Sequence, residues 1–164
     1  MTSQNGSSAK VELLIPMRAE YVSIARLTAA GVANRLGFDI DAIEDIKVSL
    51  SEVCNRIINT QVNLTQESEA ECKIVFNLSD DSISIDFHVN NMESLSFYMP
   101  VNASPESGAD SSGFNISIDK LVDDRREEEY YKDQLQLSII SLLMDEFVVN
   151  PSEGCIVSMK KYVD

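Results

Sequence analysis

The sequence predicts an α+β fold, a two-layer α/β sandwich in which helices cover one face of a mostly antiparallel sheet. Three observations predict it. Residues 11–58 contain a short apolar run followed by two segments with helical periodicity. In residues 72–89, apolar and polar side chains alternate on both sides of a polar turn. Residues 133–163 have the pattern of a helix followed by strands. With 164 residues, 44% of them hydrophobic, the chain has the length of one domain with its own core.

The first half of the chain predicts one strand and two helices. Residues 11–15 form a short apolar strand. Residues 21–36 place apolar side chains at spacings of three and four, and Gly37 can end this helix in the left-handed conformation. A second helix follows at once, opened by Asp41 in capping-box spacing with Glu44. Its predicted buried stripe consists of Ile43, Ile46, Leu50, Val53, Cys54 and Ile57.

The second half predicts a hairpin, a loop, a helix and another hairpin. Residues 72–89 alternate apolar and polar side chains around a Ser-Asp-Asp turn, and residues 90–113 are rich in Ser, Pro and Gly, which favours a loop. The charged run 123–131 indicates a solvated face or the start of a helix, and residues 133–147 predict an apolar helix. Residues 146–163 predict two strands joined by a Pro-Ser-Glu-Gly turn.

The charge of the chain argues against one class of partner. The formal net charge is −14 and the isoelectric point is about 4.3. Direct binding to a nucleic-acid backbone needs a Lys/Arg surface that releases counterions, so we expect no direct nucleic-acid contact. An acidic chain favours a basic protein partner instead.

Neither the start of the chain nor its cysteines indicates export or membrane insertion. No apolar run approaches the roughly 20 residues of a membrane-spanning helix. Residues 1–10 lack the pattern of a signal peptide and predict a disordered tail, so we expect a cytoplasmic protein whose residues 11–164 form a single domain. Cys54, Cys72 and Cys155 lack metal-ligand spacing and are expected to be reduced core residues.

Several blocks of the sequence resemble one family. The segments EYVSIARLTAAGVANRLGF and IEDIKVSLSEVCN, followed later by LLMDEFVV and VSMKKYV, resemble the RsbW and SpoIIAB family of anti-sigma factors with serine-protein kinase activity. The likeness runs in unbroken order from about residue 11 to the C-terminus. It implies the GHKL (Bergerat, histidine-kinase-like ATPase) fold and a dimer that holds a sigma factor inactive. It also implies phosphorylation of an anti-anti-sigma factor, a STAS-domain protein, on a serine with Mg-ATP.

The first motif implied by the resemblance lies in the second predicted helix. The family has a catalytic Glu and, four residues later, an Asn that ligates Mg²⁺. Glu52 is retained at the position of the carboxylate, but Arg56 stands where the Asn belongs, and an arginine cannot coordinate a cation. Asn55 lies one residue early, about 100° around the helix. At this spacing Glu52 and Arg56 can form a salt bridge, so we expect Arg56 to take the place of the metal and neutralise Glu52.

The two nucleotide motifs of the family are altered as well. Asn91 and Glu93 stand where the family has an Asp that reads adenine and a Gly beside the nucleotide. The amide of Asn keeps one acceptor oxygen, whereas Glu93 lacks the backbone freedom of glycine. Asp133, Gln134 and Gln136 replace the glycine-rich segment whose backbone amides hold phosphates at the start of the last helix. Their side chains are expected to block that cradle.

The expected function is therefore a non-catalytic anti-sigma factor, a partner-switching regulator of transcription that sequesters a sigma factor and forms a homodimer. We expect no nucleotide cofactor and no metal, because phosphoryl transfer depends on the lost contacts. Arg26 stands at the family's partner-contact position, with Arg18 and Glu20 as weaker candidates. Arg26 is equally typical of a solvated helix residue.

Two alternatives stay open. The chain could be an active serine-protein kinase that holds Mg-ATP in an altered pose, with Glu52 as base and Asn91 on adenine. It could also be a structural partner or decoy that dimerises with a catalytically intact relative. The apolar segment LSIISLLM, residues 137–144, is more typical of a core than of a dimer interface.

Overall fold

The computed structural model describes residues 8–62, 70–90, 92 and 124–164. The elements in chain order are β1 (Ala9–Pro16), α1 (Ala19–Leu36), α2 (Ile40–Val62), β2 (Glu71–Leu78), β3 (Ser82–Val89), α3 (Asp124–Leu143), β4 (Glu146–Ser152) and β5 (Cys155–Tyr162). The predicted order of strand, two helices, hairpin, helix and hairpin is confirmed. Most of the predicted loop 90–113 lies outside the described residues.

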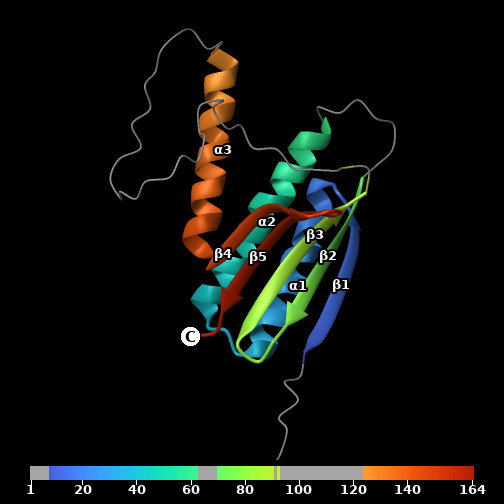
Figure 1. The fold of residues 1–164 in the computed structure, drawn as a ribbon, viewed down its shortest axis with the longest axis vertical. Coiled ribbons are helices and arrows are strands. Elements are labelled where there is room, and N and C mark those ends of the chain that lie inside the picture. The colour runs from blue at the N-terminus through green and yellow to red at the C-terminus, as the bar shows by residue number, and fades with distance from the viewer. Residues whose placement is uncertain (1–7, 63–69, 91, 93–123) are drawn as a thin grey trace, which may run out of the picture.

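The five strands form one open antiparallel sheet in the order β1-β2-β3-β5-β4. Figure 1 shows α1 and α2 behind the sheet and α3 beside them near the β4 edge. This arrangement confirms the predicted α+β sandwich. The sheet buries one face against the helices because apolar side chains occupy alternate positions of β3. Ile83, Ile85, Phe87 and Val89 are all buried.

The end of α1 and the start of α2 follow local rules. Gly37 adopts a left-handed φ of 88°, and its N–H donates to the carbonyl oxygens of the last turn of α1, as predicted. The prediction that Asp41 caps α2 is wrong. Asp39 does so, because its Oδ1 accepts a hydrogen bond of 2.7 Å from the N–H of Ala42, whereas Asp41 already lies in the first helical turn.

Helix α3 differs from its predicted range at both ends. It includes the charged run from Asp124 onward and ends at Leu143, so Phe147 belongs to β4 instead. The charged residues can belong to the helix because Glu, Arg and Lys are good helix formers. At the other end, Nζ of Lys161 donates a 2.7 Å hydrogen bond to the carbonyl oxygen of Leu143 and satisfies a terminal acceptor.

The cysteines are buried in the core, as predicted. Burial raises the pKa of the Cys54 thiol to about 12, and burial together with the neighbouring Cys54 raises the pKa of Cys72. Burial is also the main cause of the raised pKa of Cys155. The thiolate is the reactive form of cysteine, so these thiols are inert packing groups in the folded chain.

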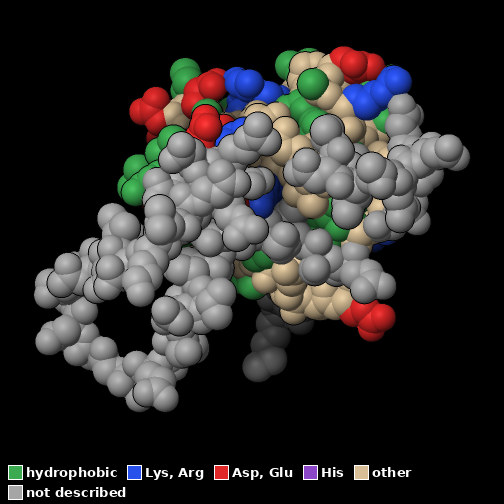
Figure 2. Space-filling view, turned by 90° about the horizontal axis from the view of Figure 1, so that it is seen from above, with side chains coloured by type: hydrophobic (Ala, Val, Ile, Leu, Met, Phe, Trp, Pro, Cys, Tyr) green, Lys and Arg blue, Asp and Glu red, His purple; other side chains and the backbone are tan. Residues whose placement is uncertain are grey.

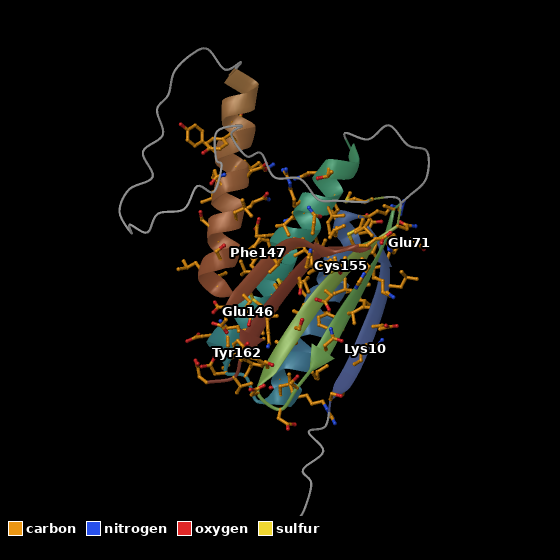
Figure 3. All side chains as sticks on the ribbon, viewed as in Figure 1. Lys10, Glu71, Glu146, Phe147, Cys155 and Tyr162 are labelled. Atoms are coloured by element: carbon orange, nitrogen blue, oxygen red, sulfur yellow. The ribbon has the colours of Figure 1, made fainter. Side chains whose placement is uncertain are left out.

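The last hairpin is held by side chains as well as by its ladder. The hydroxyl of Tyr162 donates a 2.6 Å hydrogen bond to Oε1 of Glu146 and accepts one of 2.8 Å from Nζ of Lys160. Figure 3 shows Glu146 and Tyr162 next to each other at the end of this hairpin. The same pair of strands carries Lys161, which links the sheet to α3.

The described surface is mixed in character. Seen from above, it carries acidic, basic and hydrophobic side chains close together (Figure 2). Within the described ranges, none of the helices combines the length and the apolar character that crossing a bilayer requires.

Candidate functional site

One side of α2 carries a polar stripe that faces α3. Asp45, Ser49, Glu52 and Arg56 recur at spacings of four, three and four residues, so they lie along one side of the helix. Helical periodicity separates them from the apolar stripe of α2 that packs in the core. Glu52 and Arg56, the two residues predicted to mark the altered catalytic motif, are adjacent on this polar stripe.

An ion pair joins this stripe to α3. Nη1 of Arg56 contacts Oδ1 of Asp133, and the two side chains are only 13% and 1% exposed. A guanidinium and a carboxylate make a charge-assisted hydrogen bond, which is stronger than a neutral one in a buried setting. The structure therefore brings together two residues 77 positions apart, both of which were predicted to disrupt the nucleotide site.

A second contact lies one turn along both helices. Nε2 of Gln136 donates a 3.2 Å hydrogen bond to Oε2 of Glu52. The predicted salt bridge between Glu52 and Arg56 is not formed, because Arg56 reaches Asp133 and the carboxylate of Glu52 is turned to Gln136. Within the described residues, Oε1 of Gln136 and the hydroxyl of Ser49 are buried without a hydrogen-bond partner.

A third contact completes the seam, by which we mean the contacts between the polar stripe of α2 and helix α3. Nζ of Lys161 lies 3.2 Å from Oδ2 of Asp45 and also binds the carbonyl oxygen of Leu143. Contacts therefore connect positions 56 with 133, 52 with 136, and, through Lys161, 45 with 143. Residue numbers rise on one helix as they fall on the other, so α2 and α3 run antiparallel along the seam.

The remaining predicted site residues differ in whether the structure describes them and in the contacts that they make. Gln134 is partly buried, and its carbonyl oxygen accepts a 2.7 Å hydrogen bond from the hydroxyl of Ser138, within the helix. Asn91 and Glu93 lie outside the described residues. Sequence reasoning missed Ser49 and Lys161. The position of Ser49, three residues before Glu52, could have indicated its side of α2, whereas nothing in the sequence connects Lys161 with α3.

The candidate partner-binding residues lie on or just before α1. Arg18 and Glu20 are exposed and form a 3.2 Å ion pair. Arg26 is partly buried, whereas Ile24 at 43% and Leu27 at 72% exposure are two exposed apolar side chains of the same helix. At about 100° per residue, Leu27 is the nearer of the two to Arg26 and Ile24 lies on nearly the opposite side of α1. Exposed apolar side chains are typical of protein-binding surfaces.

The charges of the seam disfavour a bound triphosphate. A nucleotide that used the space between these helices would meet the carboxylates of Glu52 and Asp133, and Arg56 cannot supply a metal ligand. Mg²⁺ is held in proteins by oxygen ligands and bridges phosphates to them. In the part of the chain that the structure describes, no group of three or more His, Cys, Asp or Glu residues is placed to hold a metal ion.

The fold is that of a known class of protein. The family of histidine kinase-like ATPase domains matches residues 15–161, and the chain belongs to this family. Within it, the chain is similar to the serine-protein kinase RsbW of Bacillus cereus strain G9842, with 38% identity over 154 residues that cover 94% of this chain and 85% of the relative. RsbW of B. cereus strain Q1 is 35% identical over 165 residues, and RsbW of Bacillus anthracis is 35% identical over 167 residues, with the same coverage. The chain is thus an RsbW-like member of the GHKL family.

Proposed function

We propose that this chain is a non-catalytic anti-sigma factor that sequesters a sigma factor by protein–protein binding and no longer uses Mg-ATP. The ion pair between Arg56 and Asp133 carries the proposal. The pair supports the proposal because the resemblance implies a metal ligand at the position of Arg56 and a phosphate cradle at the position of Asp133.

The physical reason is electrostatic. Phosphoryl transfer depends almost entirely on positioned charges that hold the phosphates and stabilise the transition state. For Mg-ATP to enter in the family's manner, the nearly buried pair of Arg56 and Asp133 would have to separate, and removing one partner from such a pair is strongly destabilising. The retained carboxylate of Glu52 is also engaged by Gln136.

The partner surface in this proposal is α1. It does not include the seam, so loss of nucleotide binding leaves it intact. Arg26 and Leu27 offer one cation and one exposed apolar group to a partner. We propose that this surface binds a sigma factor and, in competition, an anti-anti-sigma factor of the STAS type, and that the chain acts as a homodimer.

The test is capture of sigma factors from the organism that encodes this chain. Wild-type protein is expected to retain one sigma factor through size-exclusion chromatography, and Arg26→Glu is expected to weaken retention at least tenfold, roughly the effect of losing a hot-spot residue. Arg35→Glu is the matched control, because Arg35 is exposed in the last turn of the same helix. A wild-type chain that captures neither a sigma factor nor a STAS protein contradicts the proposal.

The alternative function is an active serine-protein kinase. The similarity to RsbW kinases and the retained Glu52 favour it. Incubation of the chain with Mg-ATP and its STAS partner separates the two functions. The proposal predicts no phosphoserine on the partner, and phosphorylation that is lost in Glu52→Gln supports the kinase.

A further inference from the structure

We propose that Asp133 is a tethered ligand: its carboxylate occupies an anion-binding position built around Arg56, which a small free carboxylate can fill when the Asp133 side chain is shortened. This inference concerns the seam alone. It requires neither a sigma factor nor nucleotide, so it can fail or succeed independently of the proposed function.

The first support is the geometry of the pair. Arg56 is anchored on α2, a helix that packs in the core, and its side chain is 13% exposed. The Cα of Arg56 is therefore positioned by α2 rather than by Asp133. The planar guanidinium presents donors in a fork that matches a carboxylate, so the site has the chemistry of a carboxylate receptor.

The second support is the near-complete burial of the anion. The Asp133 side chain is 1% exposed, and its carboxylate reaches Arg56 from a different helix. Truncation to alanine removes only the carboxylate group and leaves a space of about the size of formate. A site that is shielded from bulk water keeps electrostatic interactions strong.

The third support is unfilled hydrogen-bonding capacity in the same seam. Gln136 is 7% exposed, and its Oε1 has no hydrogen-bond partner among the described residues. A buried acceptor of this kind is commonly satisfied by a bound water or a ligand. A carboxylate has no hydrogen to donate to this oxygen, so the contact would be made through a water molecule that donates to both Oε1 and the ligand.

The charge of the seam selects the ligand class. Glu52 lies one turn from Arg56 on the same stripe and adds a negative charge close to the site. A multivalent anion such as phosphate would be repelled more strongly than a monovalent one. The expected ligand is thus a small monovalent carboxylate, and formate is the probe that matches the group removed.

The experiment compares thermal melting in sodium formate with melting in sodium chloride at equal ionic strength, about 0.2 M. Asp133→Ala is expected to melt below the wild type in chloride and to regain about 3–5 °C in formate, because a ligand that binds the native state stabilises it by mass action. Asp133→Asn keeps the space filled and is expected to show no formate-specific rise. Arg56→Met combined with Asp133→Ala removes the receptor and is also expected to show none.

Each result bears on the inference. If Asp133→Ala does not fold in chloride, formate must recover soluble folded protein during refolding, and failure in both salts contradicts the inference. Equal melting of Asp133→Ala in the two salts contradicts it as well. So does a rise in formate of the same size in the double variant, because that effect would not depend on Arg56.

Discussion

Gln136 on α3 donates a 3.2 Å hydrogen bond to Glu52 on α2, one turn from the ion pair between Arg56 and Asp133. The resemblance implies that Glu52 is the carboxylate of the family's catalytic motif and that Gln136 stands in its phosphate cradle. Residues from these two segments of the sequence contact each other in the folded chain. This mutual contact explains how the fold can persist with polar side chains between two packed helices.

The buried ion pair is expected to show strong coupling between its two partners. Asp133→Ala leaves the guanidinium of Arg56 without this carboxylate and should lower the free energy of unfolding by about 3–5 kcal/mol. Replacement of both residues by apolar ones, Arg56→Met with Asp133→Leu, should recover most of that loss. Urea denaturation of the wild type, Arg56→Met, Asp133→Leu and the double variant that combines these two substitutions measures the coupling. Losses that simply add in the double variant would contradict it.

The unsatisfied hydroxyl of Ser49 predicts an unusual effect of truncation. Ser49 is fully buried, and among the described residues its Oγ has no hydrogen-bond partner. Ser49→Ala removes an unpaired polar group and should leave stability unchanged or raise it by about 1 kcal/mol. Ser51→Ala is the control, because the Ser51 hydroxyl donates a 2.7 Å bond to the carbonyl oxygen of Lys47. A loss above about 1 kcal/mol in Ser49→Ala would show that its hydroxyl has a partner.

The start of α2 offers a paired test of the cap. Asp39→Ala removes the acceptor of the Ala42 N–H and should lower the free energy of unfolding by about 1 kcal/mol. Asp41→Ala, two residues later, loses only a favourable charge in the first turn and should have a smaller effect, about 0.5 kcal/mol or less. Chemical denaturation compares the two variants. Equal losses would mean that the side-chain hydrogen bond of Asp39 does not contribute.

The buried thiols predict a fall in stability at alkaline pH. The pKa of Cys54 is about 12 in the folded chain against 9.0 as the ordinary value, so the unfolded chain loses its proton first. The contribution of Cys54 is complete below about pH 9 and declines as the pH rises toward 12, by roughly 1 kcal/mol per pH unit. Urea denaturation between pH 8 and 10.5 should show this decline, and Cys54→Ala should reduce its slope. An unchanged slope in Cys54→Ala would contradict the assignment to this thiol.

The sequence predicts the architecture of this chain well because most elements are set by local patterns. The alternation through Ile83, Ile85 and Phe87 predicts β3 and its buried face, and Gly37 marks the end of α1. The cap of α2 is misplaced by two residues because Asp39 and Asp41 both precede a helical pattern. The residue that caps the helix is the one that directly precedes its first turn, and the left-handed turn at Gly37 determines which residue that is.

The pairing of the charged residues could not be predicted from the sequence. The resemblance implies that Arg56 and Asp133 are departures from the family motifs, and the spacing on one helix favours a salt bridge of Arg56 with Glu52. The observed pair depends on how α3 packs on α2, which is a tertiary property. The role of Lys161, which ties β5 to both helices, depends on the same packing.

We propose that the ion pair of Arg56 and Asp133 occupies the site that the resemblance implies for Mg-ATP. Calorimetric titration of the wild-type chain with Mg-ATP, up to millimolar nucleotide, tests it most directly. We predict no saturable heat, and the same null result for Mg-ADP. Saturable, magnesium-dependent binding with micromolar affinity would contradict the claim.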